Sequence, residues 1–153
     1  MSVIFNYAYT TAFPKDSKIT WAQAFEGLRY KAAAPMTFVP AIAAAEVLEQ
    51  NSGYIKRDTT LKTGDKFLED IHLYAPSLVT FKANTGQLVT NLISENAQGE
   101  LLLTFTFHIP IPDVEPGSND AQSKLKDMEN NAKGAVLQSM KTILTMFEEG
   151  KLN

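Results

Sequence analysis

The last fifth of the chain has the pattern of one long amphipathic helix, and the fold must provide a partner for its apolar face. From about Asp120 to Glu149, apolar side chains recur at steps of three or four residues: Leu125, Met128, Ala132, Val136, Met140, Ile143 and Phe147. At 1.5 Å per residue, a helix of this length is about 45 Å long. Gly134 inside it predicts a bend or a close approach of another segment, unless it is an ordinary helix glycine.

The sequence before this helix is divided by turn residues into short extended runs. They are YIKRDTTL, KFLEDIHLY, LVTFKA, QLVTNLIS and ELLLTFTFHIPI, separated by TGD, APS, NTG and NAQG. Connections this short predict antiparallel pairing of sequential strands. Residues 3–13 alternate between apolar and other side chains and predict a first strand. Residues 41–50, AIAAAEVLEQ, have helical propensity but suit a strand that enters the turn at 51–53.

A shorter helix is predicted between the first strand and this strand region. Thr20 is a suitable N-cap, apolar residues follow at helical spacing from Trp21 to Ala32, and Pro35 ends the helix. One long helix cannot cover a sheet of six or seven strands unless the sheet curves around it. The two surfaces would then meet near their ends and part in the middle, which predicts an apolar cavity between them.

Composition excludes several classes of protein. The 153 residues carry a net charge of -3 without a basic stripe, which argues against nucleic-acid binding. The absence of cysteine excludes disulfides and thiolate metal sites and suits a reducing compartment. No run of about 18 apolar residues and no leader pattern occurs, so we expect a cytoplasmic protein that does not insert into membranes. The length predicts a single domain over residues 1–153.

The order of these elements resembles the helix-grip fold of the START, birch-pollen-allergen and polyketide-cyclase (SRPBCC) superfamily. More narrowly, TWAQAFEGLRYKAAAPMTFVP and KFLEDIHLYAPSLVTF resemble the AtaL family of small fungal and bacterial proteins, named after the acetylaranotin-cluster protein. The residues that carry this resemblance are Trp21, Gly27, Leu28, Pro35, Phe38, Val39, Pro40, Phe67 and Glu69. It implies an α+β helix-grip fold: a curved six- to seven-stranded antiparallel sheet wrapped around a long C-terminal helix, with two short helices after the first strand. It also favours a strand at residues 41–50.

Glu69 and Arg57 are the candidate catalytic residues. In KFLEDIHLY, Glu69 shares the more apolar strand face with Phe67 and Ile71. If this face lines the cavity, desolvation favours the neutral carboxyl and prepares it to transfer a proton. Arg57 on the preceding strand can pair with Glu69 or orient a ligand oxygen. The alternative is an ion pair on the surface of the sheet.

The candidate ligand-binding residues are the apolar side chains expected between sheet and helices, although packing in the core would explain each of them equally well. They are Tyr7, Tyr9, Phe25, Phe38, Phe67, Ile71, Phe81, Leu103, Phe105, Phe107, Met128, Ala132, Val136 and Met140. His72 and His108 are not spaced as metal ligands, and neither a G-x-S-x-G nor a phosphate-binding glycine motif occurs. We therefore expect neither a metal nor a cofactor.

Three functions remain open. The first is binding of a hydrophobic small molecule, such as a secondary metabolite or a biosynthetic intermediate, in the cavity. The second is a cofactor-free cyclase, isomerase or dehydratase in which Glu69 transfers a proton and Arg57 orients the substrate. The third is a protein-interaction module, including a homodimer, that uses a sheet edge or the apolar turn at residues 35–40. Members of the superfamily include carriers and cyclases, so the resemblance does not choose between the first two.

Overall fold

The computed structural model describes residues 3–153, and its core element is a seven-stranded antiparallel sheet. The strands follow the order β1-β7-β6-β5-β4-β3-β2, so that β1 pairs with the last strand and the others form a meander. Their bounds are β1 Val3–Ala12, β2 Ile42–Asn51, β3 Tyr54–Leu61, β4 Lys66–Tyr74, β5 Leu78–Ala83, β6 Leu88–Glu95 and β7 Leu101–Ile111. The predicted α+β architecture is confirmed, including the strand at residues 41–50.

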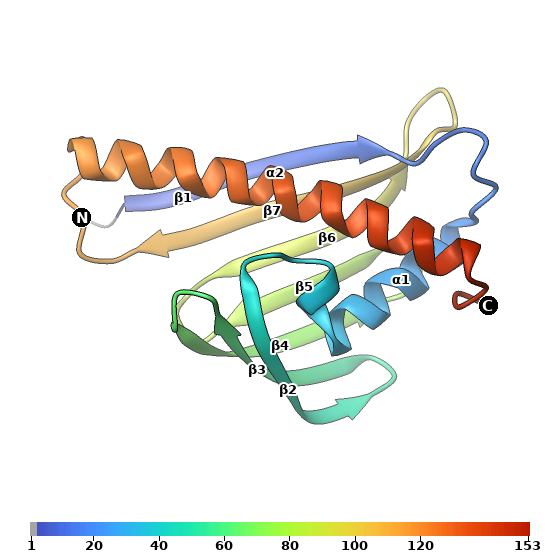
Figure 1. The fold of residues 1–153 in the computed structure, drawn as a ribbon, viewed down its shortest axis with the longest axis horizontal. Helices are drawn as coiled ribbons and strands as arrows, with labels where there is room; N and C mark the ends of the chain where they lie inside the picture. The colour runs from blue at the N-terminus through green and yellow to red at the C-terminus, as the bar shows by residue number, and fades with distance from the viewer. Residues whose placement is uncertain (1–2) are drawn as a thin grey trace.

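Three helices complete the fold: α1 (Trp21–Ala33), the 3-10 helix η1 (Pro35–Thr37) and α2 (Asn119–Glu148). Figure 1 shows α2 running the length of the molecule along the sheet, with α1 near its C-terminal half. Strands β1 and β7 lie beside α2, and strands β2 to β4 form the opposite end of the sheet, at the bottom of the view in Figure 1.

Both long helices begin at side-chain caps that the sequence provides. The Thr20 hydroxyl accepts a hydrogen bond from the Gln23 backbone at 3.1 Å, and the Gln23 side chain accepts one from the Thr20 backbone at 3.0 Å. The Ser118 hydroxyl accepts from the Ala121 backbone at 3.1 Å, so α2 starts one residue before the predicted Asp120.

The edge strand β2 shows how pairing outweighs local propensity. Its alanine-rich segment is mostly exposed and buries few side chains. Antiparallel pairing with β3 satisfies its backbone, with register shifts near Ile42/Ala44 and Val47/Glu49. The strand therefore depends on its neighbour for its conformation, and a reading of helix propensity alone predicts the wrong element.

Two clusters of buried side chains lie at the two ends of α2. The larger one joins α1 and the C-terminal half of α2 to the middle strands and includes Phe25, Ile71 and Ile143. The smaller one joins the N-terminal half of α2 to β1 and the end of β7 and includes Phe5 and Ile111. The sheet and α2 are thus held together at both ends of the helix, as the length of the helix predicts.

The two helices pack closely against each other at Gly27 of α1. A Cβ atom built on Gly27 would lie 2.7 Å from Ile143 Cγ1 of α2, well inside van der Waals contact. Gly134 of α2 has nothing within 4 Å of such an atom, so it does not mark the close approach that its position had suggested. The close packing that requires a glycine lies at Gly27 of α1 instead.

We expect Gly27→Ala to lower the free energy of unfolding by about 1–2 kcal/mol. Overpacking of the contact with Ile143 costs roughly 1–3 kcal/mol, whereas the higher helix propensity of alanine stabilises the protein by at most about 1 kcal/mol. Gly134→Ala is the matched control and should raise it by about 0.5–1 kcal/mol. Urea unfolding followed by circular dichroism measures both. Stabilisation by both substitutions would contradict the close packing of α1 on α2.

Candidate functional site

A cavity of about 380 Å³ lies between the concave face of the sheet and α2. Its walls are mostly apolar and include Phe67, Phe81, Val89, Phe105, Phe107 and Ile109 from the strands, and Met128, Ala132 and Ala135 from α2. Exposed polar residues stand at its rim, among them Thr63 and Asp65 of the β3–β4 turn and Asn131 of α2. Its polar end is formed by Lys31, Arg57 and Glu69.

Arg57 and Glu69 face each other directly across the β3–β4 ladder. Glu69 Oε1 accepts hydrogen bonds from Arg57 Nη2 at 2.6 Å, from Arg57 Nε at 2.9 Å and from the Thr59 hydroxyl at 2.6 Å. The Glu69 side chain is 4% exposed and that of Arg57 3%. The alternative of a surface ion pair is therefore wrong, and the Glu69 face of β4 is the concave one.

The two oxygens of Glu69 have different surroundings. All three donors converge on Oε1, and no hydrogen bond within residues 3–153 reaches Oε2. Glu69 also lines the cavity. Arg57, one of whose two predicted roles was to pair with Glu69, supplies the counter-charge at Oε1, and Oε2 is left for a ligand.

Arg57 also connects the sheet to the end of α1. Its Nη1 donates to the backbone carbonyl of Ala32 at 2.9 Å and more weakly to that of Lys31 at 3.4 Å. These carbonyls belong to the last turn of the helix, where backbone acceptors lack partners within the helix. A cation there also interacts favourably with the helix dipole. Arg57 is thus fully engaged by protein groups on three sides.

Lys31 is the site residue that the sequence analysis missed. Its side chain comes from the last turn of α1 and is buried, with Nζ 2.8 Å from Asn91 Oδ1 of β6. Nζ lies 4.3 Å from the ring centroid of Phe81 and 4.9 Å from that of Phe105. The signal was present, since Lys31 is four residues after Gly27 and three after Leu28, on the buried stripe of α1.

The surroundings of Lys31 make its amine unusually easy to deprotonate. Burial, and next the charge of Arg57, lower the pKa of Lys31 from 10.5 to about 7, while Glu69 acts in the opposite direction. Asn91, which lies behind this amine and does not line the cavity, has a buried Nδ2 without a hydrogen-bond partner within residues 3–153. The polar end of the cavity therefore holds a basic amine and a paired carboxylate.

The structure divides the predicted ligand-binding residues into two groups. Six of them line the cavity: Phe67, Phe81, Phe105, Phe107, Met128 and Ala132. The other eight do not line it: Tyr7, Tyr9, Phe25, Phe38, Ile71, Leu103, Val136 and Met140. They pack in or against the two clusters, because the same strand or helix face that borders the cavity continues under α1 and the ends of α2.

Twelve further residues border the cavity that were not among the candidate ligand-binding residues. They are Phe5, Val39, Ala41, Ile42, Leu61, Thr63, Asp65, Gln87, Val89, Ile109, Asn131 and Ala135. Many come from turns and segment ends, including the segment that leads from η1 into β2. Strand alternation and helix periodicity say which face of an element is buried, but they do not say which loops fold over the opening.

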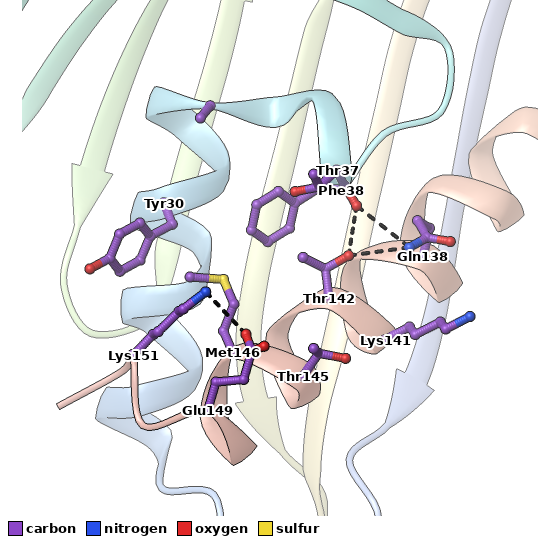
Figure 2. Close-up of a pocket in the computed structure, with 11 residues that line it drawn as sticks. Tyr30, Thr37, Phe38, Gln138, Lys141, Thr142, Thr145, Met146, Glu149 and Lys151 are labelled. Carbon is purple, nitrogen blue, oxygen red and sulfur yellow. Dashed lines mark hydrogen bonds and ion pairs between the residues drawn. The ribbon is translucent and has the colours of Figure 1, made fainter.

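A second hollow, of about 450 Å³, lies on the outer side where α1 and η1 meet the C-terminal half of α2 (Figure 2). Thr142 of α2 donates to the Thr37 carbonyl at 2.6 Å, and Gln138 donates to the Thr142 hydroxyl at 3.2 Å. Figure 2 shows these side chains joined to η1, with the Glu149–Lys151 ion pair at the rim. No buried charged group lies here, so this hollow is a seam between helices and the inner cavity is the candidate site.

Metal ligands do not gather in the described part of the chain. No group of three or more His, Cys, Asp or Glu residues in residues 3–153 is placed to hold an ion. His108 Nδ1 lies 2.7 Å from Asn6 Oδ1, and the His72 ring lies between Tyr54 and Tyr74. Among residues 3–153, no helix has both the length and the apolar composition needed to cross a bilayer.

The sequence of this chain matches the model of one protein family. The model of the family described as AtaL, acetylaranotin biosynthesis cluster protein L, matches residues 7–150. No curated protein matches the chain by sequence.

Solved structures share the fold at low sequence identity. The di-domain ARO/CYC StfQ from the steffimycin biosynthetic pathway has 13% identity and a TM-score of 0.70, and covers 97% of this chain, which spans 52% of StfQ. A protein of unknown function from Staphylococcus aureus has 11% identity and a TM-score of 0.62, with 97% of this chain and 98% of that one covered. Ara h 8.0201 has 14% identity and a TM-score of 0.59, with 93% and 99% covered.

Proposed function

The chain belongs to the AtaL family, and from this premise we propose that it binds a hydrophobic small molecule in the cavity between the sheet and α2. The observation that carries the proposal is a cavity with apolar walls and one polar end. Small-molecule sites in proteins have this character, with mostly apolar walls, a few placed polar groups and volumes of roughly 300–1,000 Å³. The 380 Å³ found here is at the smaller end of that range.

The polar end indicates which ligands fit. Lys31 offers an amine, while Glu69 Oε2 accepts hydrogen bonds and has no protein partner within residues 3–153. A ligand with an apolar ring system and oxygen groups at one end satisfies both parts of the cavity. The names of the AtaL family and of StfQ refer to biosynthesis clusters or pathways, which supports a secondary metabolite or its precursor as the ligand class.

We expect the apolar fluorescent anion 1-anilinonaphthalene-8-sulfonate to bind the protein with enhanced fluorescence, and Ala135→Leu to weaken that binding at least about tenfold. Ala135 borders the cavity from α2, so the larger side chain takes up space that the probe needs. Fluorescence titration measures the affinity. Asn130→Leu adds the same side chain at an exposed position of α2 and should leave the affinity unchanged.

Two results of this titration would count against binding in the cavity. One is no fluorescence enhancement with the folded wild-type protein. The other is equal affinity in the wild type and in a folded Ala135→Leu variant, which would place the probe elsewhere. Circular dichroism of each variant ensures that a loss of binding does not come from a loss of fold.

The free Glu69 oxygen favours a second candidate, cofactor-free acid–base catalysis on the same ligand class. In this reading Glu69 accepts a proton through Oε2, Arg57 holds the carboxylate in place, and the apolar walls exclude water. Binding does not require a proton acceptor, whereas cyclisation or dehydration does. With a metabolite that is converted, loss of turnover but not of binding in Glu69→Gln would favour the enzyme, and normal turnover would exclude Glu69 as the base.

A further inference from the structure

Lys31 has a position that structural needs alone do not explain. Its amine lies in the cavity wall among aromatic rings, and its single hydrogen-bond partner within residues 3–153 is Asn91 Oδ1. An apolar side chain of similar length would fill this space without the cost of burying an amine. The last turn of α1 does not need it either, because Arg57 already bonds the carbonyls there.

Burial and the charge of Arg57 disfavour the cationic form of Lys31, and the charge of Glu69 opposes them only in part. Within residues 3–153 no carboxylate oxygen forms an ion pair with Nζ, since the nearby Glu69 is bonded to Arg57 and Thr59. Asp65 lies at the rim of the cavity, and the residues of α2 that border the cavity carry no titratable group. Burial and the charge of Arg57 lower the pKa of Lys31 to about 7, so about half of the amine is neutral at neutral pH.

We propose that Lys31 is a nucleophile that forms an imine with an aldehyde or ketone group of the ligand. The proposal rests on the binding function proposed above and names the chemical class of the ligand, a hydrophobic carbonyl compound. Lysines are activated for this chemistry by desolvation in an apolar pocket and by a neighbouring cation; Lys31 is buried in the wall of a mostly apolar cavity, and Arg57 is the cation.

The step balances without an oxidant, a reductant or a metal. The lone pair of Nζ forms a bond to the carbonyl carbon, and the carbonyl π electrons move to oxygen. The nitrogen loses two protons and the oxygen gains two, the carbon–oxygen bond breaks, and water leaves. Amine and carbonyl thus become imine and water.

The test is reductive trapping with cinnamaldehyde, an apolar aldehyde, and sodium cyanoborohydride at pH 7. Trapping adds the mass of the aldehyde less one oxygen atom, which intact-mass spectrometry detects and peptide mapping locates. We expect modification of Lys31 at least about tenfold faster than of any other lysine, because ordinary lysines with a pKa near 10.4 are almost entirely protonated at this pH. The rate at Lys31 should rise through pH 7 and level off above it.

Lys31→Arg and Lys31→Met are the control variants. Both should lose the adduct at Lys31, while the adduct at the α-amino group, whose ordinary pKa is about 8, and the slow background at surface lysines stay the same. If Lys31 reacts no faster than the surface lysines in the wild-type protein, the imine is excluded.

Three compounds with one carbon skeleton separate this proposal from the binding function. Cinnamaldehyde, cinnamyl alcohol and cinnamate are each tested for displacement of 1-anilinonaphthalene-8-sulfonate. Displacement by all three without a fast adduct at Lys31 would overturn the imine and leave the binding function intact. Tightest binding of cinnamate without an adduct would make Lys31 an anion-binding group instead. Failure of the fluorescent probe itself to bind would overturn the binding function and the imine with it.

Discussion

Replacing Arg57 with leucine is expected to lower the free energy of unfolding by about 3–5 kcal/mol. The substitution leaves the Glu69 carboxylate, 4% exposed, without the guanidinium that donates to it at 2.6 and 2.9 Å. It also removes the donor to the Ala32 carbonyl at the end of α1. Breaking one side of a buried ion pair costs more than the pair contributes, because the remaining charge is buried alone.

The control for this prediction is the double variant Arg57→Leu/Glu69→Leu. It removes both charges, so it should recover most of the lost stability, in contrast to the single variant. The exposed pair Lys126–Glu129, at 3.6 Å, provides a comparison, and Lys126→Ala should cost no more than about 0.5 kcal/mol. Urea unfolding at pH 7 gives all these values. A cost below 1 kcal/mol for Arg57→Leu would show that water reaches Glu69 freely.

The stability difference between the wild-type protein and Lys31→Met is expected to change by about 2 kcal/mol between pH 7 and pH 9, in favour of the wild type. The pKa of Lys31 is about 7 in the folded protein, because burial and then Arg57 lower it, and 10.5 is its ordinary value. Between these two values the unfolded chain binds a proton that the folded protein does not bind. The wild-type free energy of unfolding therefore rises with pH in this range, whereas below pH 7 this contribution is constant.

The methionine side chain does not titrate, so the Lys31→Met variant serves as the reference. The contributions of all other titrating groups to the pH dependence are the same in both proteins and cancel in the difference. Urea unfolding of both proteins at pH 6, 7, 8 and 9 measures the difference directly. A difference that stays constant from pH 7 to pH 9 would mean that Lys31 keeps an ordinary pKa in the folded protein. That result would also remove the chemical basis for imine formation at this amine.

Strand alternation was sufficient to find the polar pair of the site. Residues that alternate in β3 and β4 put Arg57 and Glu69 on one face, and antiparallel pairing placed them opposite each other. Alternation did not tell whether that face was concave or exposed, and it left open whether Arg57 pairs with Glu69 or orients a ligand oxygen. Lys31 was missed for a different reason: lysine is rarely buried, so its place on the apolar stripe of α1 was overlooked.

The cavity itself was only partly predictable. Its aromatic walls on β4, β5 and β7 follow from alternation, and Met128 and Ala132 follow from the helical period of α2. Phe25, Val136 and Met140 satisfy the same patterns and yet pack in the core. The spacing of apolar residues identifies the buried face of a strand or helix. Whether a side chain on that face packs against another side chain or borders a cavity depends on the distance between the sheet and the helix.

The sequence by itself determined the number and order of the elements and the side of each that is buried. These properties depend on local periodicity, on the caps Thr20 and Ser118 and on short turns, all of which act over a few residues. The tertiary structure alone decided the register shifts between β2 and β3, the packing of α1 on α2 at Gly27, and the entry of Lys31 into the cavity beside Arg57. These outcomes depend on contacts between segments far apart in the chain, where pairing and burial outweigh local propensity.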